Sequence, residues 1–229
     1  MTAPRTLTLR VARAIGLSTA VALVAAATPE LNAERRGRGL TALVEISYLT
    51  TAIDHHFAAL RMTELAAGTD HQRDDAITPG EGTSPTPGFS ATDPRAHSDD
   101  IKSMAREGNR MQREEILRAQ NWLKAWYGIT YSPRLTAEGK AGIAILEANR
   151  GQQFDHKFLE VFSRHHYTIV QRSFDCVVGS DLAHDELKRF CRTIVESQMN
   201  AIEDMRHMLC RMFGYCDYVP FSAPDGSHS

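Results

Sequence analysis

The chain has 229 residues and a formal net charge of −2 at pH 7, with 7% aromatic residues. It is long enough to bury a substantial core, and it lacks the basic field that nucleic-acid-binding proteins use. No stretch alternates polar and apolar residues as a half-buried strand does. These properties exclude nucleic acid as a partner and favour an all-α fold.

Residues 1–33 have the three parts of a secretory signal peptide. Three arginines form a basic start, residues 14–27 are apolar, and small residues suited to cleavage follow between Ala27 and Ala33. The apolar run is short for a membrane span and rich in Ala and Thr. An uncleaved amphipathic anchor is the alternative. We therefore expect export to the periplasm or outside the cell, and no membrane contact after cleavage.

Residues 38–68 predict a first helix, which Gly68 is placed to end as a C-cap residue. Residues 69–96 hold four of the nine prolines, three glycines and many Thr, Ser and Asp. Such a segment buries too little apolar surface to offset its ordering entropy, so we expect a disordered insertion, with a binding loop as the alternative. A second helix should begin after Ser98, which can accept hydrogen bonds from first-turn amides, and end at Gly128.

Residues 129–150 predict a linker with a short helix that Thr136 caps. Residues 152–178 predict a third long helix, and a turn leads to the fourth, residues 181–213. His184 opens a heptad column of this last helix, and such columns indicate helices packed at the shallow angle of bundles. Residues 34–214 should therefore form one domain, followed by a tail of residues 215–229 folded over its end.

The two hairpins resemble each other in sequence. Aligning the two His-His pairs gives an offset of 110 residues, and aligning Gln112 with Gln198 gives an offset of 86. The first copy therefore carries a 24-residue insertion between its helices. Two duplicated helical hairpins predict an antiparallel four-helix bundle, because one pair alone cannot bury its apolar stripe on both sides.

These features together resemble a known family. The chain is similar to the bacterial domain of unknown function family 305 in four features. These are the His-His pairs, the small-x-His pattern that opens a helix, the Gln-x-x-Glu-Ile helix ending in Trp, and the lead-in FDHKFLEVFSRHH at residues 154–166. The resemblance covers residues 42–214 apart from the insertion. It implies a ferritin-like four-helix bundle, and it implies copper or silver binding through Met and His, as in some exported members.

Several His and Met side chains fall on the predicted helix seam. Imidazole binds Cu, Zn, Fe and Ni, whereas a thioether selects Cu(I) or Ag(I). With the resemblance, this donor set favours an exported, non-enzymatic protein of metal tolerance or delivery. The candidate ligands of Cu(I) or Ag(I) are His55, His56, Met62, His165, His166, His184, Met205 and Met208.

A structural or protein-interaction bundle without metal is the alternative. Its buried histidines would find hydrogen-bond partners inside the bundle, because a buried polar group without a partner is costly. Arg172 stands at the place of Met62 in the second copy, and Ser98 at that of His184 in the first, which weighs against metal binding. The buried polar network would then include Gln112, Glu115 and Gln198.

The first and third long helices should meet in a shared core. His55 and His165 lie on the heptad column, whereas His56 and His166 lie about 100° round the helix. We therefore expect His55 and His165 to be more buried than the histidines that follow them. We also expect a seam Gln or Glu, or His184, within hydrogen-bond reach of at least one of them.

No catalytic constellation is present in the sequence. The Glu-x-x-His pattern of di-iron proteins, a Gly-rich phosphate loop and a Ser-His-Asp order are all missing, so we expect no catalytic residues and no enzymatic activity. The sequence identifies no protein partner and no oligomeric state.

The four cysteines all lie in the second copy or its tail. An even number in an exported chain permits two disulfides. Three connectivities are open. Cys210 can pair with Cys216 because Gly214 lets the tail turn back, and Cys176 can pair with Cys191 across the turn between the last two helices, although the two lie at unequal distances from it. A copper-ligand role for one thiol is the alternative.

Overall fold

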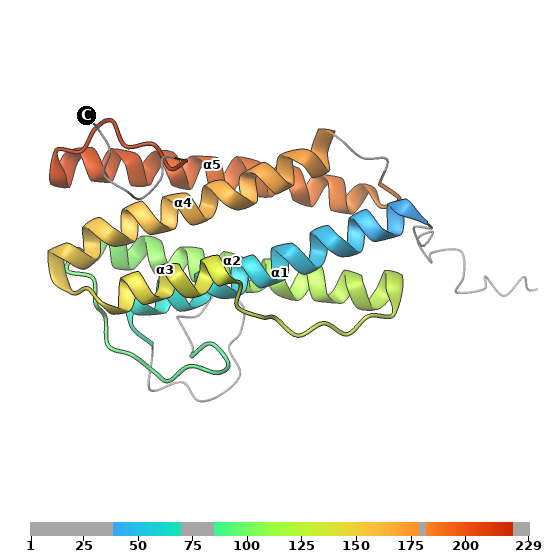
Figure 1. Ribbon diagram of the computed structural model, residues 1–229, viewed down its shortest axis with the longest axis horizontal. Coiled ribbons are helices and arrows are strands. Elements are labelled where there is room, and N and C mark those ends of the chain that lie inside the picture. The colour runs from blue at the N-terminus through green and yellow to red at the C-terminus, as the bar shows by residue number, and fades with distance from the viewer. Residues whose placement is uncertain (1–38, 70–84, 179–181, 222–229) are drawn as a thin grey trace, which may run out of the picture. The chain divides into compact units, whose positions relative to one another are not determined.

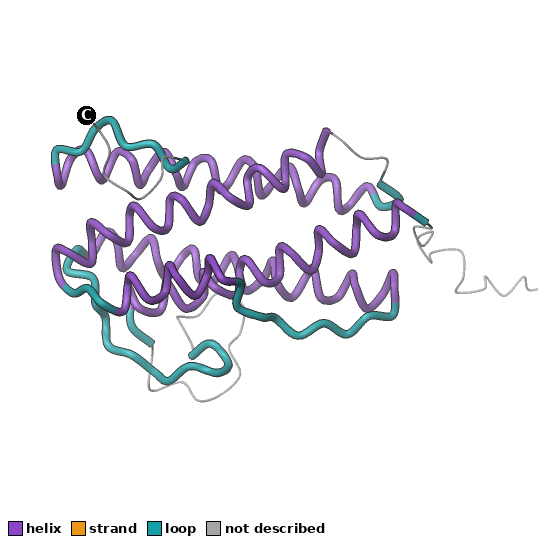
Figure 2. The backbone as a smooth tube through the Cα atoms, viewed as in Figure 1, coloured by secondary structure: helices purple, strands orange, loops and turns teal. Residues whose placement is uncertain are grey.

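A computed structural model describes residues 39–69, 85–178 and 182–221 (Figures 1 and 2). These residues belong to one compact unit, residues 34–229, and are all-helical, with five helices and no strand in the described part. None of the described helices could cross a membrane. The predicted signal peptide lies outside the described residues. The helices are α1 (Leu40–Ala67), α2 (Asp99–Tyr127), α3 (Ala137–Glu147), α4 (Gly151–Val178) and α5 (Asp185–Phe213).

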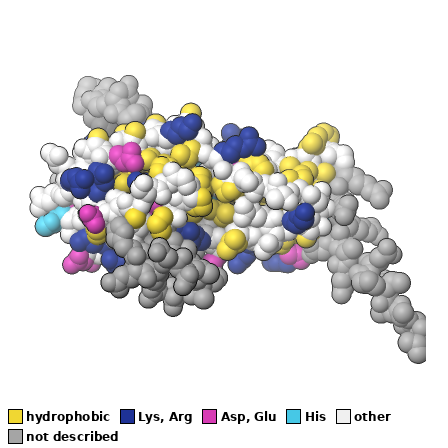
Figure 3. All heavy atoms as spheres, turned by 90° about the horizontal axis from the view of Figure 1, so that it is seen from below, with side chains coloured by type: hydrophobic (Ala, Val, Ile, Leu, Met, Phe, Trp, Pro, Cys, Tyr) yellow, Lys and Arg dark blue, Asp and Glu magenta, His cyan; other side chains and the backbone are white. Residues whose placement is uncertain are grey.

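The four long helices pack as two pairs, α1 with α2 and α4 with α5 (Figure 1). Contacts between α1 and α4 join the pairs, and the short α3 lies on both of these helices. Apolar side chains of all five helices fill two adjoining clusters, one of which holds Phe154, Phe158 and Phe162. The face drawn in Figure 3 mixes basic, acidic and apolar side chains, as a net charge near zero leads one to expect.

Local capping sets several helix ends where the sequence predicts them. The Ser98 hydroxyl accepts from the N–H of Ile101 at the start of α2, and Thr136 does the same for Gly139 in α3. Gly128 closes α2 in the left-handed conformation that favours glycine. These interactions join residues a few positions apart, so the local sequence is enough to predict them.

The start of α5 differs from the prediction. The helix begins at Asp185 rather than at residue 181, and His184 precedes it in an extended conformation. The N–H groups of Ala183 and His184 donate to Glu45 of α1, at 2.6 and 3.0 Å. Because a distant carboxylate holds this backbone, the helix starts later than its apolar pattern suggests, and the histidine is not a member of a heptad column.

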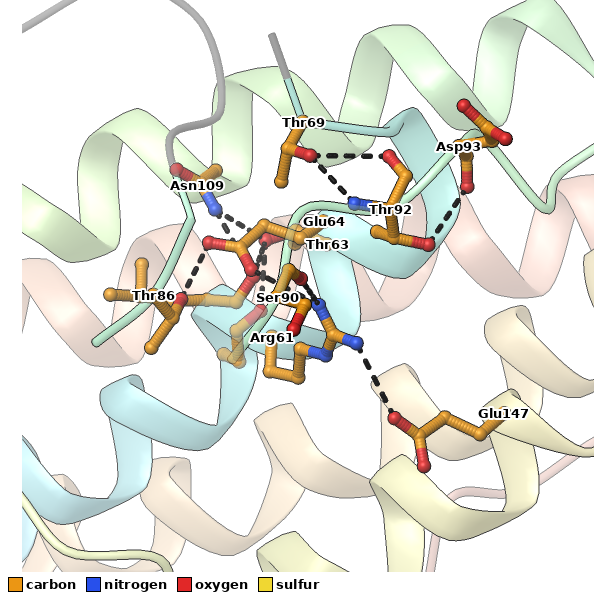
Figure 4. A network of polar contacts seen from close by, with 12 residues as sticks. Arg61, Thr63, Glu64, Thr69, Thr86, Ser90, Thr92, Asp93, Asn109 and Glu147 are labelled. Atoms are coloured by element: carbon orange, nitrogen blue, oxygen red, sulfur yellow. Dashed lines mark hydrogen bonds and ion pairs between the residues drawn. The ribbon is translucent and has the colours of Figure 1, made fainter. Parts of the chain in front are cut away.

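The prediction of a disordered insertion is wrong for residues 85–96, which lie against the bundle (Figure 4). The Thr86 hydroxyl donates to Glu64 Oε1 at 2.5 Å, and Arg61 donates to the Ser90 carbonyl at 3.0 Å. Two buried charged side chains of α1 thus give this polar segment its partners. These hydrogen bonds order residues 85–96, although the segment has too little apolar surface to be ordered by burial alone. The earlier part, residues 70–84, lies outside the described residues.

Two disulfides join parts of the second helix pair and its tail. Cys176–Cys191 links α4 to α5, with 6.1 Å between the Cα atoms, and Cys210–Cys216 links the end of α5 to the tail, with 4.2 Å. Of the three connectivities that the sequence left open, this is the one formed, and no cysteine is free. Tyr218 of the tail is buried against the bundle, as the fold-back predicted for this segment requires.

Candidate functional site

Four imidazoles meet where α1 contacts α4, and we call His55, His56, His165 and His166 the histidine cluster. The rings of His55 and His165 stack face to face, with centroids 3.6 Å apart and planes 5° from parallel. The Nε2 atom of His165 lies 3.1 Å from the backbone carbonyl oxygen of His55, to which it donates. The structure thus brings the His-His pairs of the two halves together, as the shared-core prediction requires.

All four rings are buried, and the burial prediction holds for the second pair, where His165 is 3% and His166 4% exposed, but is wrong for the first. His55 is 6% exposed and His56 only 1%, so the first histidine of this pair is not the more buried one. The reason is that α1 contacts α2, α3 and α4. Every α1 residue from 55 to 67 is buried, so this part of the helix has no solvent face for His56 to occupy.

The predicted contact with a seam carboxylate is made by His56. Its Nε2 atom lies 2.7 Å from Glu115 Oε2 on α2, and its Nδ1 atom lies 2.7 Å from the carbonyl oxygen of Ala52. Because a carbonyl only accepts, Nδ1 carries a hydrogen. His56 faces α2 because it lies about 100° round α1 from His55, which faces α4. The other ring nitrogen, Nε2, therefore faces the carboxylate.

Burial keeps the other three imidazoles neutral. Burial and, to a lesser extent, the nearby imidazole of His56 lower the pKa of His165 to about 3. Burial likewise holds the pKa of His55 and of His166 well below its usual range, and the neighbouring histidines act in the same direction. Neutral imidazole is the form that binds metals.

Each of these neutral rings has one buried nitrogen that makes no hydrogen bond of good geometry in the described part of the chain, and His55 and His166 make only weaker contacts to the backbone of His165 and Phe162. These atoms are Nε2 of His55, Nδ1 of His165 and Nδ1 of His166. Because His165 donates through Nε2, its Nδ1 atom carries the lone pair. Buried polar atoms without partners are few in folded proteins, and each costs roughly 1–3 kcal/mol. Three in one cluster mark it as the candidate site.

The three methionine candidates lie in the apolar core. Met62, Met205 and Met208 are buried in the apolar cluster around Phe158, and the Met62 methyl group lies against α3 at Gly142. Within the described ranges, no group of three His, Cys, Asp or Glu side chains is placed to hold one metal ion.

The predicted amide partners also fall outside the histidine cluster's hydrogen bonds. Gln112 and Gln198 are buried on α2 and α5, as the seam predicts. Neither donates to or accepts from a histidine among the described residues. Of the three seam residues, Glu115 alone contacts the cluster.

His184 occupies a second polar site at the start of α5. Its Nδ1 atom lies 2.6 Å from Glu45 Oε2, which also accepts from the Tyr127 hydroxyl. Its ring stacks on Trp126 with centroids 3.7 Å apart, and its Nε2 atom is buried without a hydrogen-bond partner. Both side chains of this ion pair are fully buried. The pair belongs to the joint between α1, α2 and α5.

Two buried carboxylates that the sequence analysis missed tie the halves together. Asp155 of α4 accepts from the N–H groups of His97 and Ser98, at 2.8 and 2.9 Å, just before α2. Glu45 makes the matching contacts just before α5. Asp155 lies 110 residues after Glu45, the offset of the two His-His pairs, and this alignment was the available signal. Each first helix thus caps the second helix of the other pair.

Comparison with known proteins identifies the family. The structure is similar to CopM in the Cu(I)-bound form and to CopM in the Ag-bound form, with TM-scores of 0.54 and 0.53. In both cases 18% of residues are identical, and the match covers 74% of this chain and 98% of CopM, which shows a shared fold. No curated protein matches in sequence. The model of the domain of unknown function family DUF305 matches residues 90–209, more than half of the chain, so the chain belongs to the DUF305 family.

Proposed function

We propose that the protein binds a soft monovalent metal ion, Cu(I) or Ag(I), at the histidine cluster and catalyses no reaction. The observation that carries the proposal is the set of three buried, neutral imidazoles that each keep one nitrogen without a partner. An ion bound by two of these nitrogens would remove the cost of leaving those two unpaired. The ion is cargo in this proposal and not a cofactor.

The donor chemistry fits such an ion. Imidazole nitrogen binds copper, and a neutral ring needs no deprotonation first. The available donors are Nε2 of His55, Nδ1 of His165 and Nδ1 of His166. Cu(I) and Ag(I) accept two ligands, whereas a zinc site takes four in tetrahedral geometry. A site with few donors therefore suits the monovalent ions better than zinc.

Three further observations support this function. The chain belongs to the DUF305 family, and the similar CopM structures are described with Cu(I), Ag and Cu(II) bound. We extend that binding to this chain as a proposal. Export by the predicted signal peptide would place the protein in the periplasm or outside the cell, where it would serve metal tolerance or delivery.

We also propose that the four long helices are a ferritin-like antiparallel bundle built from two duplicated hairpins. The two helices of each pair run in opposite directions in Figure 1. The first helix of each pair has 28 residues and the second has 29. The matching caps from Glu45 and Asp155 add a structural equivalence to the sequence alignment.

A competition titration tests the metal proposal. The exported protein is titrated with Cu(I) against a chromophoric Cu(I) chelator, with ascorbate as the reductant because it leaves disulfides intact. We expect the double variant His55→Gln/His165→Gln to bind at least about 100-fold more weakly, since losing even an outer partner of a ligand costs 10–100-fold. The control is His97→Gln, at an exposed histidine. Equal affinity of the double variant and the wild type would exclude this site.

One observation favours the alternative function, a structural or protein-interaction bundle that binds no metal. The ion pairs His56–Glu115 and His184–Glu45 give two histidines a carboxylate partner within the protein. In this function His165→Ala lowers the free energy of unfolding by about 1–3 kcal/mol, with or without Cu(I). In the metal-binding function Cu(I) raises the stability of the wild type and leaves that of the variant unchanged. Unfolding curves with and without Cu(I) therefore separate the two functions.

A further inference from the structure

The two disulfides differ in their access to solvent. Cys176 and Cys191 are buried in the core, at 4% and 0% exposure. Cys216 is exposed at the surface of the tail, and Cys210 is half-buried at the last turn of α5. Thiol–disulfide exchange begins with attack of a thiolate on an accessible sulfur, so access sets its rate. A reductant in solution should therefore open Cys210–Cys216 first.

Other contacts hold the tail in place without this disulfide. The N–H groups of Gly214 and Tyr215 donate to carbonyls of the last turn of α5. Arg206 Nε donates to the Tyr218 carbonyl at 2.9 Å. The Tyr218 hydroxyl donates to the Glu160 carbonyl on α4 at 2.7 Å, and the ring is buried. The two sulfurs therefore stay near each other after the bond between them breaks.

We propose that Cys210 and Cys216, once reduced, form a second binding site for a soft monovalent metal ion, separate from the histidine cluster. Thiolate sulfur is a ligand that selects Cu(I) and other soft ions. Two sulfurs held close together bind an ion with less loss of freedom than two independent thiols do. The inference uses none of the residues of the proposed function and stands if that function fails.

The chemistry balances in two steps. A dithiol, such as a small-molecule dithiol or a dithiol oxidoreductase, attacks the disulfide and becomes a disulfide itself. It supplies two electrons and two protons, and Cys210 and Cys216 become thiols. The metal ion then displaces both thiol protons to solvent and binds the two sulfurs without changing its own oxidation state. The oxidised protein therefore lacks this site, and the reduced protein has it.

Selective reduction tests the first step. The full-length exported protein is treated with increasing dithiothreitol, quenched with an alkylating agent and analysed by peptide mass spectrometry. We expect Cys210 and Cys216 to be alkylated at a dithiothreitol concentration at least about tenfold below the one that opens the buried pair, because access limits exchange. Cys176–Cys191 is the control within the same molecule. Opening of both disulfides at the same concentration would overturn the inference.

Metal titration of the selectively reduced protein tests the second step. After anaerobic removal of the reductant, we expect it to bind one more Cu(I) than the oxidised protein, with an ultraviolet thiolate-to-copper charge-transfer band. Wild-type protein alkylated at Cys210 and Cys216 should lose the band and the extra ion. So should the variant Cys210→Ser/Cys216→Ser. The variant His55→Gln/His165→Gln should keep both. No band in the reduced wild type, or an undiminished band after alkylation, would refute the site.

Discussion

The buried histidines make the metal-free protein sensitive to acid in a range that His165 helps to set. Its pKa is about 3 in the folded protein, against an ordinary value of 6.5. Between pH 6.5 and 3, His165 therefore binds a proton in the unfolded chain and stays neutral in the folded chain. The stabilising effect of this group is complete above pH 6.5 and is lost as the pH falls toward 3.

The size of the effect follows from the shift. Each pH unit below 6.5 removes about 1.4 kcal/mol from the free energy of unfolding through this one group. The loss is about 1.4 kcal/mol at pH 5.5 and about 2.7 kcal/mol at pH 4.5. His55 and His166 have pKa values shifted in the same direction, so they add to the slope.

Urea unfolding followed by circular dichroism at pH 7.5, 6.5, 5.5 and 4.5 measures this slope. We expect His165→Gln to reduce it by about 1.4 kcal/mol per pH unit below pH 6.5, since glutamine does not titrate. The control is His207→Gln, whose side chain is 62% exposed and which should keep the wild-type slope. A stability that stays level from pH 6.5 to 4.5, or a full slope in His165→Gln, would refute the reasoning.

Three further predictions concern buried carboxylates and their partners. Burial raises the pKa of Glu64 from 4.5 to about 7. The contribution of Glu64 to the free energy of unfolding is therefore most favourable below pH 4.5 and falls by up to about 3 kcal/mol as the pH rises to 7. In urea unfolding, the variant Glu64→Gln should not show this fall. Glu45→Gln breaks the buried pair with His184 and should lower the free energy of unfolding at pH 7 by about 3–5 kcal/mol. Asp155→Asn alters contacts to backbone N–H groups and should lower it by about 0.5–2 kcal/mol, and chemical denaturation measures both. Thr86→Val leaves one oxygen of Glu64 without its hydroxyl donor and should lower the unfolding midpoint by the equivalent of about 1–3 kcal/mol. An unchanged midpoint in Glu45→Gln, Asp155→Asn or Thr86→Val, or a full fall with pH in Glu64→Gln, contradicts the corresponding contact.

Helix ends were predictable where their caps are local. Ser98 and Thr136 each accept from an N–H three residues later, and this pattern can be read directly from the sequence. The start of α5 was not predictable in this way, because its cap comes from Glu45, 139 residues before His184. Sequence periodicity continued the helix through Ala183 and His184, which the distant carboxylate holds outside the helix.

The histidine cluster was predictable in its members and not in its geometry. The two His-His pairs stood out because of their repeat, and their meeting followed from a shared core. Which ring contacts Glu115 depended on α1 being covered by three other helices, and this contact pattern is a property of the assembled fold. The order of residues 85–96 was missed for a related reason. Its partners, Arg61 and Glu64, are charged residues that a composition argument places on the surface.

The two long-range caps explain why the cluster is buried so deeply. Glu45 fixes α1 to the start of α5, and Asp155 fixes α4 to the start of α2, so each first helix is joined to the opposite pair. Both joints draw α1 and α4 toward each other, and His55 and His165 stack in the resulting contact. A surface imidazole would keep its pKa and its hydrogen bonds to water. The crossed caps remove the rings from water and leave neutral nitrogens with no partner in the described part of the chain, which is the chemical state that a soft metal ion can use.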